Sequence, residues 1–264
     1  MNDDKRKLLA DVFAGKSVDR VPVGFWFHFV HPETQDAIKN PSVRKANIDG
    51  QRDFFKTLKP DFVKLMSDGY FCYPHPELFS AKDISVLKNL TSIGPDNPWI
   101  VEQGTLVSEQ RACFDYDVYT FYTIFSPATM LKFMLGNFTL SGNKKLSDFI
   151  MQDKEAVKHA LDVMAEDFIA VSEQAIKAGG ADGIFLSVQN IQDCRVNKAV
   201  YDEVIAPSEI KILEAVNKIS EQSILHICGY EGVKNHIEWY KPNSLRIKSQ
   251  RIRPYLYIHI PLSL

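Results

Sequence analysis

The feature that most constrains the fold of this chain is a long apolar helix followed at once by a glycine pair and a short apolar strand. Apolar residues recur every three or four positions from Asp153 to Ala178, which predicts one helix with a single apolar stripe. Gly179-Gly180 is typical of a helix end, and residues 181–187 have the composition of a buried strand. This order of helix, glycine and apolar strand is typical of an α/β unit.

The same alternation recurs along the chain. Further helices are predicted over 5–14, 47–58, 126–134 and 197–220, and further strands over 21–27, 62–66, 118–125 and 223–228. Five strands separated by helices favour a parallel sheet and indicate a (β/α)8 TIM-barrel type of fold. We expect one domain over residues 1–264, with a lid-like insertion over the irregular segment 70–117.

The end of the chain is atypical in composition. No acidic residue follows Glu238, whereas lysines and arginines accumulate after residue 240. Three interpretations stay open for residues 241–264: a basic, solvated terminus, a final strand over 255–260, or an out-of-frame or truncated tail. The third is favoured, because five predicted strands leave a barrel incomplete at its C-terminus.

Composition and charge exclude several classes of partner. The 264 residues are 45% hydrophobic and have a net charge of -2, so we expect neither nucleic acid nor an anionic membrane surface as a partner. No apolar run approaches the roughly 18 residues that a membrane span needs, and the chain start lacks the features of a signal peptide. Four scattered cysteines are too few for a disulfide framework, which predicts a cytoplasmic protein.

One predicted strand ends in two residues that could bind a metal. Alternation over residues 223–228 puts His226 and Cys228 on one face, because side chains two apart on a strand point the same way. An imidazole and a thiol side by side supply half of a zinc site. Both residue types are also common in protein cores, so the spacing alone leaves a buried, structural pair as the alternative.

Other candidate residues also have structural interpretations. Asp68 could cap a helix or accept buried hydrogen bonds. His28 and His31 flank an aromatic segment and are either substrate contacts or packing and solvated residues. The aromatic residues of this segment could line a cofactor pocket, although a barrel core explains them more simply.

Several motifs together resemble one known family. They are Asp19-Arg20-Val21-Pro22-Val23 after the opening helix, Ser67-Asp68, Phe125-Ser126-Pro127-Ala128-Thr129, Gly180-Ala181-Asp182-Gly183-Ile184 and His226-Ile227-Cys228-Gly229. In these motifs residues 5–240 resemble the uroporphyrinogen decarboxylase superfamily, which also contains cobalamin-dependent methyltransferases. The resemblance implies a (β/α)8 barrel with its chemistry at the carboxyl ends of the strands. Independently, periodicity places Asp68, Ser126, Gln189, His226 and Cys228 at or just past predicted strand ends.

The sequence matches the decarboxylase branch of the superfamily at one position and departs from it at four. Asp68 matches the catalytic aspartate that the resemblance implies. No arginine stands in segment 24–32, where decarboxylases carry an arginine signature, Phe133 replaces a tyrosine, and Gln189 replaces a serine. The late histidine of the family would fall beyond residue 264. These departures disfavour decarboxylation of a porphyrinogen (tetrapyrrole) without a cofactor, which is kept as the alternative.

The methyltransferase branch is matched more closely. Its members bind zinc through His-x-Cys and a distant cysteine, and His226 and Cys228 match the first two ligands. The resemblance implies a zinc-dependent transfer of a methyl group from a corrinoid protein to a thiol, with Asp68 orienting substrate or a ligand. Cys72, His75 or Cys194 could replace the third ligand. A further alternative is an inactive, truncated relative, whose open barrel would expose apolar surface and form a homo-oligomer.

Overall fold

The fold is a five-stranded parallel sheet with helices in the connections, seen in a computed structural model that describes residues 4–32, 34–189, 194–229, 236–240 and 256–258. The strands are β1 (Phe62–Leu65), β2 (Tyr119–Phe125), β3 (Gly183–Val188), β4 (Ile224–Ile227) and β5 (Leu256–Ile258), hydrogen-bonded in chain order. This is the topology of a (β/α)8 barrel wall, so the predicted fold class is confirmed. The described residues supply five strands, which leaves β1 and β5 as the edges of an incomplete barrel.

Most of the predicted elements are present. The helices are α1 (Lys5–Phe13), α2 (Pro41–Leu58), α3 (Ser85–Lys88), α4 (Pro98–Arg111), α5 (Pro127–Gly136), α6 (Ser141–Gln152), α7 (Lys154–Glu173), α8 (Lys198–Val200) and α9 (Ala206–Val216). Short helical turns are η1 (Pro76–Leu78), η2 (Gln174–Ala178), η3 (Tyr201–Ile205) and η4 (Ile237–Tyr240). The strand that was one of three interpretations for 241–264 corresponds to β5, while 241–255 and 259–264 lie outside the described residues.

The predicted first strand over 21–27 is wrong. This segment is extended but joins no ladder with the strands that the structure describes, and a main-chain bond from the N–H of Asp61 to the carbonyl of Val23 at 2.8 Å ties it to the start of β1. The N–H of Val23 donates to the Asp61 carboxylate at 2.8 Å instead of to a neighbouring strand, and Pro22 has no N–H to donate. Alternation of apolar residues therefore predicted an extended backbone correctly but not a strand partner.

The segment predicted as a lid-like insertion, 70–117, contains a full crossover helix. Helix α4 links β1 to β2 and packs on α7 and η2. Its buried face includes Gln103 and Gln110, whose amides bond to the Trp99 carbonyl at 2.7 Å and to the Asn47 amide oxygen at 2.7 Å. These buried polar residues interrupt the apolar periodicity, which is why the sequence pattern missed the helix.

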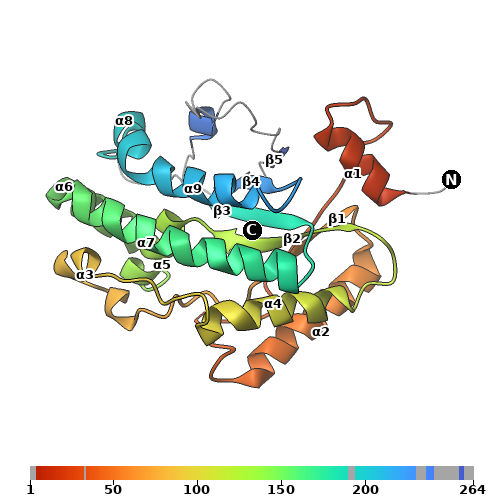
Figure 1. The fold of residues 1–264 in the computed structure, drawn as a ribbon, viewed down its shortest axis with the longest axis horizontal. Coiled ribbons are helices and arrows are strands. Elements are labelled where there is room, and N and C mark those ends of the chain that lie inside the picture. Colours follow the sequence, from red (N-terminus) through yellow and green to blue (C-terminus); the bar gives the residue numbers. More distant parts are fainter. Residues whose placement is uncertain (1–3, 33, 190–193, 230–235, 241–255, 259–264) are drawn as a thin grey trace.

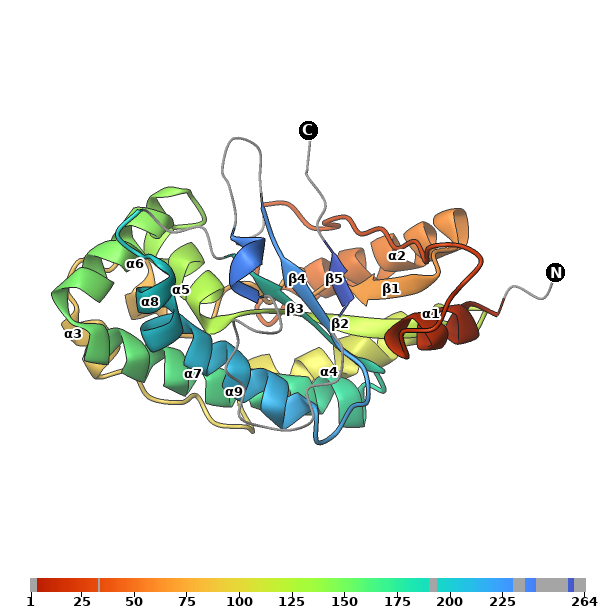
Figure 2. The ribbon, with the colours of Figure 1, turned by 90° about the horizontal axis from the view of Figure 1, so that it is seen from above.

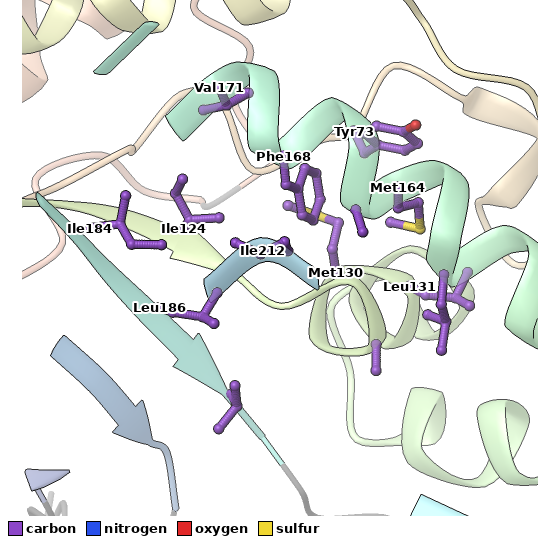
Figure 3. Packing of buried hydrophobic residues seen from close by; sticks show 14 of the residues in the cluster. Tyr73, Ile124, Met130, Leu131, Met164, Phe168, Val171, Ile184, Leu186 and Ile212 are labelled. Atoms are coloured by element: carbon purple, nitrogen blue, oxygen red, sulfur yellow. The ribbon is translucent and has the colours of Figure 1, made fainter. Parts of the chain in front are cut away.

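The outer face of the sheet carries the main hydrophobic core. Helices α4, α7 and α9 lie side by side along this face, while α5, α6 and α8 gather beyond the carboxyl ends of the strands (Figures 1 and 2). Ile124, Ile184 and Leu186 point from the strands toward Phe168 of α7 and Ile212 of α9 (Figure 3). None of the described helices is both long and apolar enough to span a membrane.

The inner face of the sheet is closed at its amino end and open at the other. Helix α1 lies at the amino ends of the strands (Figure 2), where Leu9 packs with Phe62, Phe121 and Phe185. This aromatic plug fills the barrel interior below the carboxyl ends. The space above it is a cavity.

Candidate functional site

A cavity of about 500 Å³ lies at the carboxyl ends of the strands on the inner face of the sheet. Lys64 of β1, Phe125 of β2, Ser187 of β3 and His226 of β4 all line it. The register explains their convergence, because Phe125 lies opposite Ser187 and Ser187 lies opposite His226. The volume is in the range of small-molecule sites, and the location is that of barrel active sites.

Aromatic side chains form most of the cavity wall. They are Phe25, Trp26, Phe27, Phe71, Phe125, Phe133 and Phe138. The first three belong to the extended segment that Asp61 holds through its bonds to Arg20 and to the Val23 N–H. Gly24 permits the close approach of this segment to the sheet, since a Cβ there would lie 2.4 Å from the Phe62 ring. The aromatic residues of the sequence thus line a pocket as well as a core.

His226 and Cys228 are brought to the same cavity, as their spacing predicted. The His226 ring is 6% exposed and packs edge-on against Trp26 at 5.5 Å between ring centroids. The Cys228 N–H donates to the Val188 carbonyl at 2.7 Å, and the Gln189 amide donates to Cys228 Sγ at 3.8 Å. One imidazole and one thiol therefore line the same cavity at the carboxyl end of β4.

The third zinc ligand of the sequence prediction is not found among the described residues. Cys72 donates to the Thr34 carbonyl at 3.7 Å, His75 bonds to the Glu77 carboxylate at 2.6 Å, and neither lines the cavity. Cys194 is exposed. No group of three or more His, Cys, Asp or Glu side chains suited to a metal occurs in the described part of the chain. His226 and Cys228 fit two positions of a zinc site, and the described residues leave the others to water, substrate or further protein groups.

A buried lysine that the sequence reasoning missed faces the same cavity. Lys64 Nζ lies 4.6 Å from the ring centroid of Phe185 and 4.9 Å from that of Trp26. Burial lowers the pKa of Lys64 to about 8, an effect that the nearby Cys228 and Asp68 oppose. A charged residue inside the apolar run 62–66 was the sequence signal that could have identified it.

A second buried lysine, Lys132, hydrogen-bonds to Gln189. Lys132 Nζ donates to the main-chain carbonyl of Gln189 at 2.8 Å and lies 3.4 Å from its side-chain oxygen. Burial lowers the pKa of Lys132 to about 7, and both Cys228 and Glu209 act against that shift. Lys132 thus interacts electrostatically with the Cys228 sulfur, and its charge changes near neutral pH.

Glu209 belongs to a buried hydrogen-bonded cluster on the far side of Lys132. The Tyr201 hydroxyl donates to Glu209, and the Tyr240 hydroxyl lies 3.3 Å from the same carboxylate oxygen. Burial raises the pKa of Glu209 to about 7, while its hydrogen bonds to Tyr201 and Ser126 oppose the rise. Two buried groups near the site, Lys132 and Glu209, can therefore change charge near neutral pH.

Asp68 does not reach the cavity itself. It is 1% exposed, and its two carboxylate oxygens accept from His28 Nδ1 at 2.9 Å and from the Phe29 N–H. Its own carbonyl accepts from the Asn47 amide at 3.0 Å. His28, rather than Asp68, lines the cavity. The residue singled out from the sequence is thus buried behind a histidine for which the sequence left both roles open.

Comparisons with known proteins place this chain in a family. The uroporphyrinogen decarboxylase (URO-D) family matches residues 64–242, so the chain belongs to the uroporphyrinogen decarboxylase family. A solved structure described as a methyltransferase from Methanosarcina mazei has the same fold, with a TM-score of 0.50 and 14% sequence identity. The match covers 86% of this chain and 70% of the other. A search of curated proteins found no match.

Proposed function

We propose that this protein is a zinc-dependent methyltransferase that moves a methyl group from a corrinoid protein to a small-molecule thiol. The observation that carries the proposal is the convergence of His226 and Cys228 on one cavity, next to the Gln189 amide. The structural similarity to a methyltransferase from Methanosarcina mazei supports the same branch of the family. The four cysteines are free thiols, which supports a reducing, cytoplasmic location.

The residues of the cavity suit an anionic sulfur. When bound at His226 and Cys228, zinc would keep the acceptor as a thiolate near neutral pH. The new S–C bond would form as the Co–C bond of the donor breaks, with the electron pair of that bond left on cobalt. Lys64 and Lys132 place positive charge near Cys228, which favours negative charge on sulfur at this end of the cavity.

The cavity wall argues against the alternative, decarboxylation of a porphyrinogen. Such a substrate is a polycarboxylated macrocycle, and guanidinium groups are the side chains that bind several carboxylates best. No arginine is among the cavity-lining residues that the structure describes, and Lys64 is the lysine among them. The wall is instead mostly aromatic, which suits a smaller and less charged ligand.

Zinc content is the first test of the proposal. The purified parent should hold about one zinc ion per chain, and His226→Ala and Cys228→Ser should each lose most of it, because a site with one fewer donor binds zinc poorly. Cys113→Ser is the matched control, since Cys113 bonds to the Glu109 carbonyl and does not line the cavity. Metal analysis by mass spectrometry gives the readout. Equal zinc in parent and site variants would show that the assignment is wrong.

Methyl transfer is the second test. Zinc-loaded parent is incubated with methylcobalamin as donor and a panel of small thiols, and loss of the methyl–cobalt absorbance is followed. We expect transfer by the parent and by Cys113→Ser, but not by Cys228→Ser. Turnover of uroporphyrinogen by the metal-free parent, with no transfer to any thiol, would instead establish the decarboxylase alternative.

A further inference from the structure

His28 and Asp68 form a hydrogen-bonded pair at the wall of the cavity. Nδ1 of His28 lies 2.9 Å from one oxygen of Asp68, and the other oxygen accepts the Phe29 N–H. The His28 side chain is 39% exposed and lines the cavity, whereas that of Asp68 is 1% exposed. One partner is therefore fixed within the protein, and the other faces the space where substrate would bind.

The hydrogen bonds define the tautomer of the imidazole. An ionised carboxylate only accepts hydrogen bonds, so Nδ1 of His28 must carry its proton toward Asp68. In the neutral ring Nε2 then has a lone pair, and no hydrogen bond to Nε2 occurs among the residues that the structure describes. A carboxylate that orients an imidazole in this way is the arrangement of a general base.

The surroundings of His28 suit proton transfer. Its ring packs edge-on against Phe71 at 5.6 Å and lies 6.2 Å from the ring of His31. The titratable groups that face it are Asp68 and His31, and those that share its cavity are Lys64, His226 and Cys228. The exposed part of the ring gives a proton a path to solvent.

We propose that His28 is the general base of this cavity, with Asp68 as the residue that positions it. The inference rests on the proposed methyl transfer and names the group that takes the proton of the acceptor thiol. The S–H bond breaks and an N–H bond forms at Nε2. The sulfur keeps the electron pair and uses it to form the S–C bond, and His28 then releases the proton to solvent.

The test compares zinc-loaded parent, His28→Gln, Asp68→Asn and His31→Gln, with methylcobalamin and 2-mercaptoethanol as probes. We expect His28→Gln to lower kcat about 100-fold or more, with unchanged zinc content and KM, because a positioned base contributes about this much. Added imidazole should restore part of the His28→Gln rate, which a purely structural role would not allow. His31→Gln is the matched control, because His31 is an exposed histidine of the same segment whose ring lies 6.2 Å from that of His28.

Asp68→Asn provides a second, independent measurement. It should lower kcat without rescue by imidazole, since its His28 ring is still present but no longer oriented. A parent that transfers methyl groups together with a fully active His28→Gln would overturn this inference alone. A zinc-loaded parent that transfers none would overturn the proposed function, and the inference with it. Thermal unfolding of each variant identifies any loss of activity that comes from misfolding.

Discussion

The outer and inner faces of the parallel sheet are made by the same strands but differ in what their side chains do. On β3, Ile184, Leu186 and Val188 are fully buried against the helices of the outer layer. Between them Phe185 packs on the inner face and Ser187 lines the cavity. The period of two in a strand thus separates residues that stabilise the fold from residues that form the site.

The two faces of the sheet differ in how their side chains affect the stability of the fold. The outer face of β3 is close-packed and apolar, whereas the inner face of the sheet holds Lys64 and His226 beside aromatic rings. A buried ammonium group lowers stability unless a nearby charge compensates for it. Such a group in the wall of a cavity indicates a functional role, since a methionine would fill the same space at lower cost.

The largest loss of stability is expected when a buried side chain on the outer face of the sheet is truncated. Leu186→Ala should lower the free energy of unfolding by about 2–5 kcal/mol, because it removes a fully buried side chain and leaves a space that the helices cannot fill. Its neighbour Ser187 faces the cavity, so Ser187→Ala is the matched control and should change stability little. Urea unfolding followed by circular dichroism measures both. Similar losses in the two variants would contradict the division between the faces.

A gain in stability, of intermediate size, is expected when Lys64 is replaced. Its pKa is about 8 in the folded protein and ordinarily 10.5, so the unfolded chain binds more protons between these values and parent stability rises with pH through this window. The full penalty is present below pH 8. Lys64→Met should therefore be more stable than the parent at pH 7, by up to about 3 kcal/mol.

This gain at Lys64 should shrink as the pH rises. Urea unfolding at pH 7 and pH 10 gives the free energy of unfolding of the parent and of Lys64→Met. The difference between the two proteins at each pH removes the contribution of other titrating groups, which both proteins share. A difference that stays constant between these pH values would show that the Lys64 ammonium is not destabilised by burial. Methyl transfer by Lys64→Met should be impaired despite the higher stability.

The smallest effect is expected at the polar cluster of the outer layer. Tyr201→Phe removes a donor to the buried Glu209 carboxylate, which should cost about 1–2 kcal/mol and raise the pKa of Glu209 further. Tyr119→Phe is the control, since Tyr119 is only partly buried at the start of β2. Chemical unfolding at pH 6 and pH 8 provides the measurement. Equal stability of Tyr201→Phe and the parent would exclude a structural role for this hydroxyl.

Periodicity predicted the elements that form the sheet and its helices. The long stripe from Asp153 to Ala178 became α7 and η2, and Asp153 accepts the Ala156 N–H at its start. Four mostly apolar runs became β1 to β4, because short, mostly apolar segments between helices are typical of buried parallel strands. Helix α4 was missed because the glutamines on its buried face bond to other protein groups rather than to water.

Local sequence could not predict which distant residues meet at the site. The pairing of His226 with Cys228 follows from strand geometry over two residues, but the bond between Asp68 and His28 joins two segments 40 positions apart. The same holds for Lys132, which lies on an apolar helix and reaches Gln189 only because α5 packs beside β3.

The sequence by itself determined the α/β alternation, the family and the two candidate zinc ligands, because each depends on spacing within one element. Only the tertiary structure decided that Asp68 is buried behind His28, that Lys64 and Cys228 line the same cavity and that segment 21–27 lines this cavity instead of joining the described strands. These outcomes depend on packing and hydrogen bonds between elements. A pattern within one segment does not contain them, because burial and partner choice are set by the whole fold.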